Sequence, residues 1–287
     1  MTARQQRHRR LARAFLSNPT AVTGAGITLI VLLAAGLGAT LMPYGPGEAD
    51  FFNLISPPSW VHPFGTDSFG RDVLTRVMYG ARVSLAISAA GVAMAAVVGT
   101  AAGMISAYEG RYADLVLMRV ADLLFAFPAF VLALFLMVVL GYGSANVALA
   151  IALTYLPIFA RLARNMTLLV REEPYVEAAR LMAQSTPRIL LREILPNIAA
   201  PLIVQATIGI AFGIIIEAGL SFLGIGVQPP TPSLGVIMAD GREYFQRGPW
   251  VLTMTGLAIS VALLGLNLRG DGLRDLMDPR LRQGAAQ

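Results

Sequence analysis

Long apolar stretches constrain this chain more than any other feature of its sequence. Six windows offer about the 20 apolar residues that a helix needs to cross a hydrocarbon core of about 30 Å. They cover residues 21–42, 83–106, 113–141, 145–162, 198–223 and 250–268. Charged residues make up only 14% of the chain, against about 25% in a typical soluble domain. The expected fold class is therefore an all-α membrane protein with six transmembrane helices, of which the fourth is the shortest.

The arginines predict how these spans are oriented. The chain has no lysine, and seventeen of its twenty-two basic residues fall in the amino-terminal segment, the 106–119 turn, the 161–197 loop and the carboxyl tail. The remaining five are Arg71, Arg76, Arg82, Arg242 and Arg247. Because cytoplasmic loops carry an excess of basic residues, both termini and the 161–197 loop are expected to be cytoplasmic. The net charge of +5 is mostly this orientation signal and does not predict nucleic-acid binding.

The predicted organisation is an Arg-rich cytoplasmic amino terminus, residues 1–20, and a six-span domain, residues 21–287. The start RQQRHRRLARAF is similar to the charged region of a signal peptide, but the apolar stretch after it is too long for a leader. A retained span is expected, and a cleaved leader is the alternative. Segments on the outer side are expected at about 43–82 and 224–249, and a cytoplasmic loop at about 163–197.

Both outer segments carry signals of local structure. In the first, Val73, Val77 and Val83 recur at near-helical spacing, which predicts an amphipathic helix that lies at the interface and leads into span two. The second segment is too apolar for a free loop and too rich in Gly and Pro for a full span. A shallow re-entrant or interfacial element, covered by protein, is expected there.

Residue types that the chain lacks exclude several chemistries. Without lysine there is no G-x-x-x-x-G-K-[ST] phosphate loop. With no cysteine and only His8 and His62, a His/Cys zinc site or a thiol nucleophile is out of reach within one chain. A carboxylate hydrolase remains open in principle, although no spacing favours it.

Three ionisable residues fall inside predicted spans, where charges are costly and usually pair or line a polar cavity. Arg119 and Asp122 lie three residues apart, hence on one helical face, and a structural ion pair is favoured over a substrate site. Glu217 either serves a proton or ion pathway or is a hydrogen-bonded structural carboxyl. Pro128 and Pro157 each remove a backbone donor and predict kinks.

The cytoplasmic loop contains the polar stretch YVEAARLMAQ, residues 175–184. Two glutamates followed by Pro174 predict a helix start. In that helix Val176, Ala179, Arg180 and Ala183 share a face, which is expected to present small residues to another protein. Ser185 or Thr186 caps a second short helix that is expected to end at Pro196. Two short helices joined by a turn form a projecting knob that suits docking in a groove.

The pattern EAA, with a small residue four positions later and LP near the end of the second helix, resembles the cytoplasmic signature loop of ATP-binding-cassette importer permeases. Three further stretches resemble the second permease of the dipeptide/oligopeptide/nickel branch of that family: HPFGTDSFGRDVLTRVMYGARVSL, EAGLSFLGIGVQPPTPSLGVIMADGR and GDGLRDLMDPRLR. The resemblance covers about residues 15–283. It implies a type I importer fold and a multi-pass protein of the bacterial inner membrane.

The resemblance also implies partners. They are a second permease, which favours a heterodimer, two ATPase subunits that hold ATP and Mg²⁺, and an extracytoplasmic solute-binding protein. This chain itself is then not an enzyme and holds no cofactor. The residues that fall on the coupling motif are Glu177, Ala178, Ala179, Ala183, Leu195 and Pro196. Ala183 stands where the family usually has Gly, so the joint between the two helices is expected to shift to residues 184–186.

The implied function is ATP-driven uptake of di- or oligopeptides, although nickel, glutathione-like and other solutes use similar permeases. The alternative from another class is a secondary carrier driven by an ion gradient through Arg119, Asp122 and Glu217. It predicts internal repeats with broken spans at matching positions, and the two halves show no convincing repeat. A purely structural scaffold is the third possibility.

Overall fold

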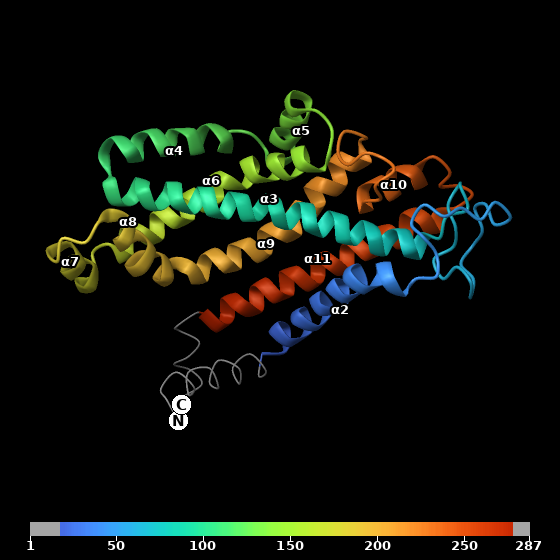
Figure 1. The fold of residues 1–287 in the computed structure, drawn as a ribbon, viewed down its shortest axis with the longest axis horizontal. Helices are drawn as coiled ribbons and strands as arrows, with labels where there is room; N and C mark the ends of the chain where they lie inside the picture. The colour runs from blue at the N-terminus through green and yellow to red at the C-terminus, as the bar shows by residue number, and fades with distance from the viewer. Residues whose placement is uncertain (1–17, 278–287) are drawn as a thin grey trace.

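The computed structural model describes residues 18–277 as an elongated bundle of helices (Figure 1). The helices that run along the bundle are α2 (Pro19–Leu41), α3 (Val73–Glu109), α4 (Arg111–Phe125), α6 (Ser144–Val170), α9 (Leu195–Phe222) and α11 (Pro249–Met277). The other elements are α5 (Ala129–Leu140), α7 (Pro174–Leu181), α8 (Thr186–Ile189), the π-helical turn η1 (Leu190–Ile194) and α10 (Leu234–Arg242). Residues 1–17, in the Arg-rich start, and residues 278–287, which include the end of the stretch GDGLRDLMDPRLR, lie outside the described residues.

The six predicted spans are present. Five helical segments are long and apolar enough to cross a membrane, and the bent pair α4 and α5 provides the sixth. The predicted shortest span, 145–162, is part of α6, which has 27 residues. The expectation of an all-α membrane protein with six spans is therefore confirmed, with the third span broken.

The third span bends by 95° between α4 and α5, at the position predicted for a kink. Pro128 directly precedes α5 and has extended backbone angles, as expected for a residue that cannot continue the hydrogen-bond ladder. As a result α4 lies along α3, while α5 lies across the bundle (Figure 1). Pro157, in contrast, lies inside the continuous helix α6.

Helix α3 corrects the prediction of a separate interfacial helix before span two. It runs without a break for 37 residues, about 55 Å at 1.5 Å per residue. Asp72 caps its first turn by accepting a 2.8 Å bond from the Thr75 backbone N–H. Val73 and Val77 are buried in a cluster with Val251 of α11. Packing against other helices, rather than a membrane surface, thus covers the apolar face of this segment.

Close contact between α3 and α6 forms the centre of the bundle. A side chain at Gly99 would lie 2.6 Å from the Leu156 carbonyl oxygen, and one at Gly103 would overlap the Ala160 carbonyl oxygen. Small residues let two backbones approach in a membrane, where van der Waals packing replaces the hydrophobic effect between helices. The glycines therefore fix how closely α3 and α6 pack.

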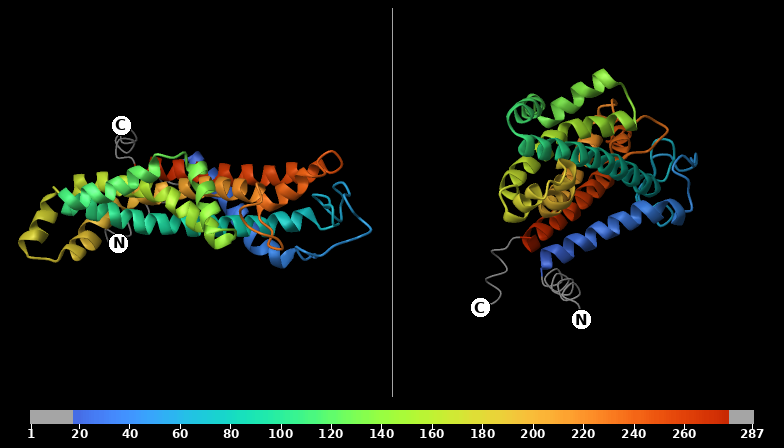
Figure 2. Two further views of the ribbon diagram at one scale, coloured as in Figure 1. Left: turned by 90° about the horizontal axis from the view of Figure 1, so that it is seen from above. Right: turned by 60° about the vertical axis from the view of Figure 1, so that its left-hand side comes forward.

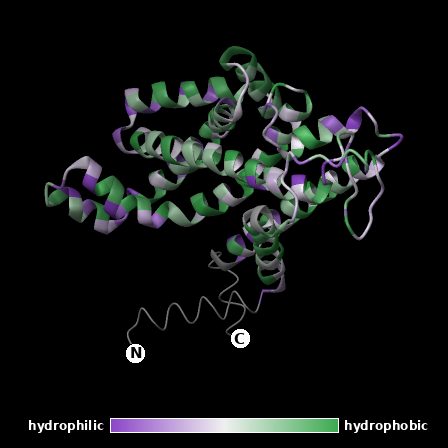
Figure 3. Ribbon diagram, turned by 45° about the vertical axis from the view of Figure 1, so that its right-hand side comes forward, coloured by the Kyte–Doolittle hydropathy of each residue, from purple (hydrophilic) through white to green (hydrophobic). Residues whose placement is uncertain are grey.

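Two polar regions lie at opposite ends of this bundle (Figures 1 and 2). One is the knob, residues 171–194, which contains α7, α8 and η1. The other is the cap, residues 43–72 and 224–248, in which helix α10 packs on α3, α9 and α11. Polar residues gather at both ends, whereas the helices between them are largely apolar (Figure 3).

Candidate functional site

The knob begins as the sequence predicts. Helix α7 starts at Pro174, directly after the N-cap Glu173. It ends in a Schellman turn, in which the Gln184 N–H bonds the Ala179 carbonyl at 3.2 Å and the Ala183 N–H bonds the Arg180 carbonyl at 2.9 Å.

Ala183 occupies the left-handed position of this turn, with φ of 55°. The prediction that replacing Gly by Ala moves the joint to residues 184–186 is therefore wrong. The Schellman hydrogen bonds hold the turn in place, although the left-handed conformation costs an L-residue about 1–2 kcal/mol.

The face of α7 that was predicted to dock a partner is divided: Val176 and Ala179 point inward, whereas Arg180 and Ala183 are exposed. Val176 and Ala179 are buried in the same cluster as Ile189 and Ile194 of the following segment. The apolar residues at this spacing thus attach α7 to its own chain, because the nearest apolar surface available to them is the segment that follows the turn. This corrects the prediction that Val176 and Ala179 are presented to another protein.

The outward face of the knob carries other residues. Glu177 and Ala178 are exposed on α7. Leu181 and Met182, which precede the turn, are 82% and 69% exposed. Sequence reasoning missed these two residues, although adjacent large apolar residues at the tip of a polar loop were an available signal. Exposed apolar side chains with a polar rim mark an interaction site.

Contacts with α3 orient the knob. The Arg180 guanidinium donates a 3.2 Å hydrogen bond to the Tyr108 hydroxyl and lies 4.8 Å from the centre of that ring. Arg171 donates to the Ala107 carbonyl at 2.7 Å. Desolvation, together with Glu173 and Glu193, raises the pKa of Tyr175.

The second helix of the knob does not end at Pro196, which corrects another prediction. Helix α8 starts after Ser185 and continues through η1 into α9. The Leu195 N–H bonds the Leu190 carbonyl, five residues back. Pro196 has no N–H and would clash with the carbonyl four residues before it in a regular helix, and a π-turn is a common solution to such strain. Leu195 is half-buried and Pro196 is exposed.

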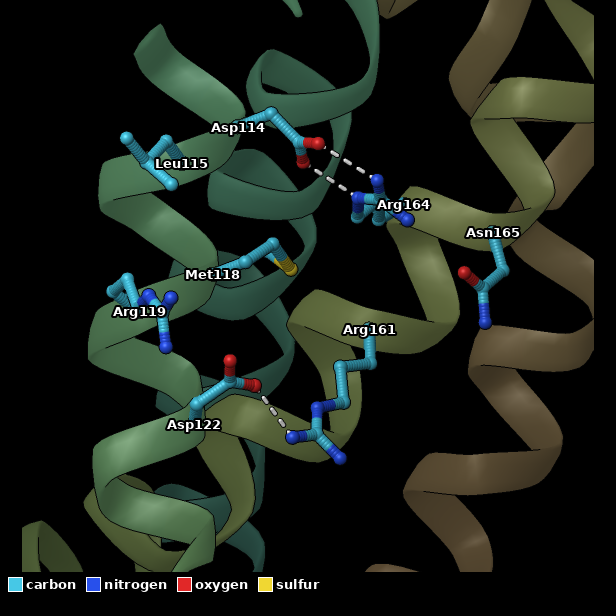
Figure 4. A pocket seen from close by; sticks show the side chains of 8 residues that line it. All are labelled: Asp114, Leu115, Met118, Arg119, Asp122, Arg161, Arg164 and Asn165. Atoms are coloured by element: carbon cyan, nitrogen blue, oxygen red, sulfur yellow. Dashed lines mark hydrogen bonds and ion pairs between the residues drawn. The ribbon is translucent and has the colours of Figure 1, made fainter. Parts of the chain in front are cut away.

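The predicted ion pair between Arg119 and Asp122 is replaced by a different one. Asp122 pairs with Arg161 of α6 at 2.6 Å (Figure 4). Asp114, one helical turn from the start of α4, accepts hydrogen bonds from Nε and Nη2 of Arg164 at 2.6 and 2.7 Å. The two arginines of α6 lie three residues apart and face α4, a signal that the sequence contained but that reasoning within one span did not use.

Glu217 is fully buried on α9 near the cap. Its Oε1 accepts a 2.7 Å bond from the Ser221 hydroxyl, which in turn accepts the Val227 N–H. The hydroxyl oxygens of Ser84 and Ser233 accept the N–H groups of Leu234 and Val236, respectively, and Oε2 of Glu217 has no hydrogen-bond partner among the described residues. This arrangement agrees with the hydrogen-bonded structural alternative for Glu217.

A buried charge cluster at the cap was not predicted. Arg76 of α3 is 4% exposed and bonds both Asp67 and Asp240, the latter at 3.0 Å. Arg71 contacts the same two carboxylates at 2.6 and 3.2 Å. The cluster joins the 43–72 segment, α3 and α10, which are up to 169 residues apart in the sequence.

Comparison with known proteins identifies relatives over almost the whole chain. Residues 99–283 match the family described as binding-protein-dependent transport system inner membrane component, and residues 8–58 match the N-terminal TM domain of oligopeptide transport permease C. A dipeptide transport system permease protein of Alkalihalophilus pseudofirmus is 40% identical, over 92% of this chain and 87% of that protein. A putative peptide transport system permease protein of Brucella abortus is 44% identical, over 94% and 91%.

A glutathione transport system permease protein of Escherichia coli is 40% identical, over 94% of this chain and 89% of that protein. Among solved structures, an inward-facing MetNI methionine ABC transporter has a chain that superposes with a TM-score of 0.56 at 19% identity. The match covers 71% of this chain and 97% of that chain. At this identity the structural match supports the fold alone.

Proposed function

The chain belongs to the family of binding-protein-dependent transport system inner membrane components, and from this membership we infer that it is a permease subunit of an ATP-driven importer of di- or oligopeptides. Its relatives are transport subunits rather than enzymes. The structural observation that carries the proposal is the knob, a rigid projection that presents Leu181 and Met182 to the solvent.

The coupling role of the knob follows from how it is attached. Helix α6 leads into it and α9 leads out of it, and both helices continue along the bundle to the cap end (Figure 1). A displacement of the knob by a motor subunit is therefore transmitted to two spans at once. Glu177, Ala178 and Ala183 lie at the contact with the motor in this proposal, whereas Ala179, Leu195 and Pro196 shape the knob and its junction with α9.

The proposed assembly contains a second permease, two ATPase subunits and a solute-binding protein outside the membrane. ATP and Mg²⁺ are bound on the ATPase subunits, since this sequence has no phosphate loop. The knob and both termini face the cytoplasm of a bacterial cell, as the distribution of arginines favours. Transport requires that ATP binds the inward-open and outward-open states with different affinity.

Short peptides are the proposed cargo because relatives that cover most of the chain are named as dipeptide or peptide permeases. The similarity to a glutathione permease protein fits the same class, since glutathione is itself a short peptide.

Co-purification tests the proposal. A tagged chain is isolated from gently solubilised bacterial membranes, and its companions are identified by mass spectrometry. We expect a second permease and one or two ATPases with the unaltered chain, and loss of the ATPases with Leu181→Asp. Leu54→Asp, at an exposed leucine of the cap, is the matched control and should retain them.

Recovery of the chain alone, in a state that moves peptide without nucleotide, would favour the secondary carrier instead. The positions of the residues do not support that alternative. Asp122 is paired with Arg161 in the part of α6 toward the knob, whereas Glu217 is bonded to Ser221 near the cap. These groups do not form one continuous ion pathway.

A further inference from the structure

A charged groove between α4 and α6 has no part in the coupling contact. Its cavity measures about 480 Å³. Six of the eight side chains that line it are polar or charged, and the set comprises Asp114, Leu115, Met118, Arg119, Asp122, Arg161, Arg164 and Asn165 (Figure 4).

The charges of this groove are unevenly matched. Arg164 neutralises Asp114, and Arg161 neutralises Asp122. Within residues 18–277, no ion pair involves the third guanidinium, that of Arg119, which lines the same cavity. Three positive and two negative groups leave a net charge of +1. The groove thus holds a planar set of hydrogen-bond donors that no carboxylate of the described chain uses.

The uncompensated charge lies toward the knob end of the bundle. Helix α6 has 27 residues, about 40 Å, so its ends extend beyond a hydrocarbon core of about 30 Å. Arg161 and Asn165 precede the end of α6 at Val170 by about 14 and 8 Å along the axis. The groove therefore lies toward the knob end of α6, where the exposed Arg119 guanidinium is accessible to a ligand.

We propose that Arg119 binds an oxyanion in this groove. A guanidinium matches a carboxylate or a phosphate with two parallel hydrogen bonds. Two sources supply this chemistry: the terminal carboxylate of a peptide in transit, and the phosphate of an anionic phospholipid in the leaflet at the knob end. The first source rests on the proposed function, whereas the second is independent of it.

The test uses the purified transporter with its partner subunits in phosphatidylcholine nanodiscs, with and without phosphatidylglycerol. Native mass spectrometry measures retained phosphatidylglycerol. Reconstituted uptake is compared for a dipeptide with a free carboxyl terminus and for its amidated form. In Arg119→Gln we expect either the retention of phosphatidylglycerol or the preference for the dipeptide with a free carboxyl terminus to fall about tenfold, the effect of losing a charged hydrogen bond. Arg119→Lys should keep part of the affected preference, because lysine retains the positive charge but lacks the two parallel N–H donors of the guanidinium.

Arg247→Gln is the matched control, because it removes one exposed arginine at the cap end. Loss of phosphatidylglycerol in Arg119→Gln alone assigns the site to the phospholipid, and loss of discrimination against the amide assigns it to the cargo. The proposal would be overturned if Arg119→Gln changed neither phosphatidylglycerol retention nor the discrimination against the amidated dipeptide. It would also be overturned if the unaltered transporter neither retained phosphatidylglycerol nor discriminated against the amide. Failure of the ATPases to assemble with the unaltered chain would instead count against the proposed function, and the phosphatidylglycerol arm would still decide the site.

Discussion

The cap and the knob differ in whether they bury charged side chains, although both expose large apolar residues, such as Trp60 in the cap and Leu181 in the knob. In the cap, charged side chains lie inside: Arg76 is 4% exposed and joins Asp67 to Asp240. In the knob, residues 171–194, no charged residue is buried, and Leu181 and Met182 are 82% and 69% exposed.

This difference indicates different tasks. A buried charge is tolerated only when it is paired, and removal of its partner is costly, so the cluster fixes the cap to α3. An exposed pair of large apolar residues stabilises nothing within the chain and is available to a partner. We therefore expect substitutions in the buried charge cluster at the cap to change stability and substitutions on the outward face of the knob to change coupling.

Arg76→Ala should give the largest effect. It leaves Asp67 and Asp240 with Arg71 as their remaining partner, and breaking a buried ion pair costs about 3 to 5 kcal/mol. Thermal melting of the purified permease, followed by fluorescence-detected size-exclusion chromatography, measures the loss. Arg247→Ala removes an exposed arginine of the same region and should leave the melting temperature unchanged. Equal melting for both variants would contradict a structural role for the cluster.

Glu217→Ala should have the next largest effect. It leaves the buried Ser221 hydroxyl without its acceptor, and an unsatisfied buried polar group costs about 1 to 3 kcal/mol. Glu217→Gln keeps a carbonyl oxygen at the same place and should lose less. The same melting assay ranks the two variants, and a glutamine variant as unstable as the alanine variant would show that the charge, rather than the hydrogen bond, matters.

Ala183→Gly should stabilise the knob. Glycine adopts the left-handed conformation of this position without the penalty of about 1 kcal/mol that alanine incurs. Hydrogen exchange of residues 177–184 should become slower, while exchange in α10 stays the same. Faster exchange in the knob would mean that the left-handed turn is absent in solution.

Glu177→Arg should have the smallest effect on stability and a clear effect on coupling. Glu177 is exposed, and surface substitutions usually change stability by no more than about 0.5 kcal/mol. The stimulation of ATPase activity by substrate should nevertheless fall, because the reversed charge lies on the proposed contact with the motor subunit. Glu243→Arg, at an exposed glutamate of the cap, is the control. Normal stimulation in Glu177→Arg would remove this residue from the coupling role.

Local signals in the sequence were sufficient for several features of the structure. The apolar windows located all six spans, Pro174 marked the start of α7, and Pro128 marked the bend of 95° in the third span. These features depend on residues close together in the chain: an apolar run must be long enough to cross a bilayer, and a proline removes a hydrogen bond wherever it stands.

Contacts between distant residues were decided by the tertiary structure. The sequence alone could not show that Asp122 pairs with Arg161 instead of Arg119, or that Arg76 meets Asp240 across 164 positions. It could not show which face of α7 is covered either, because periodicity identifies an apolar face but not the surface that buries it. The sequence by itself determined which segments are helices that cross a membrane, whereas packing decided which residues face each other and which remain exposed to a partner.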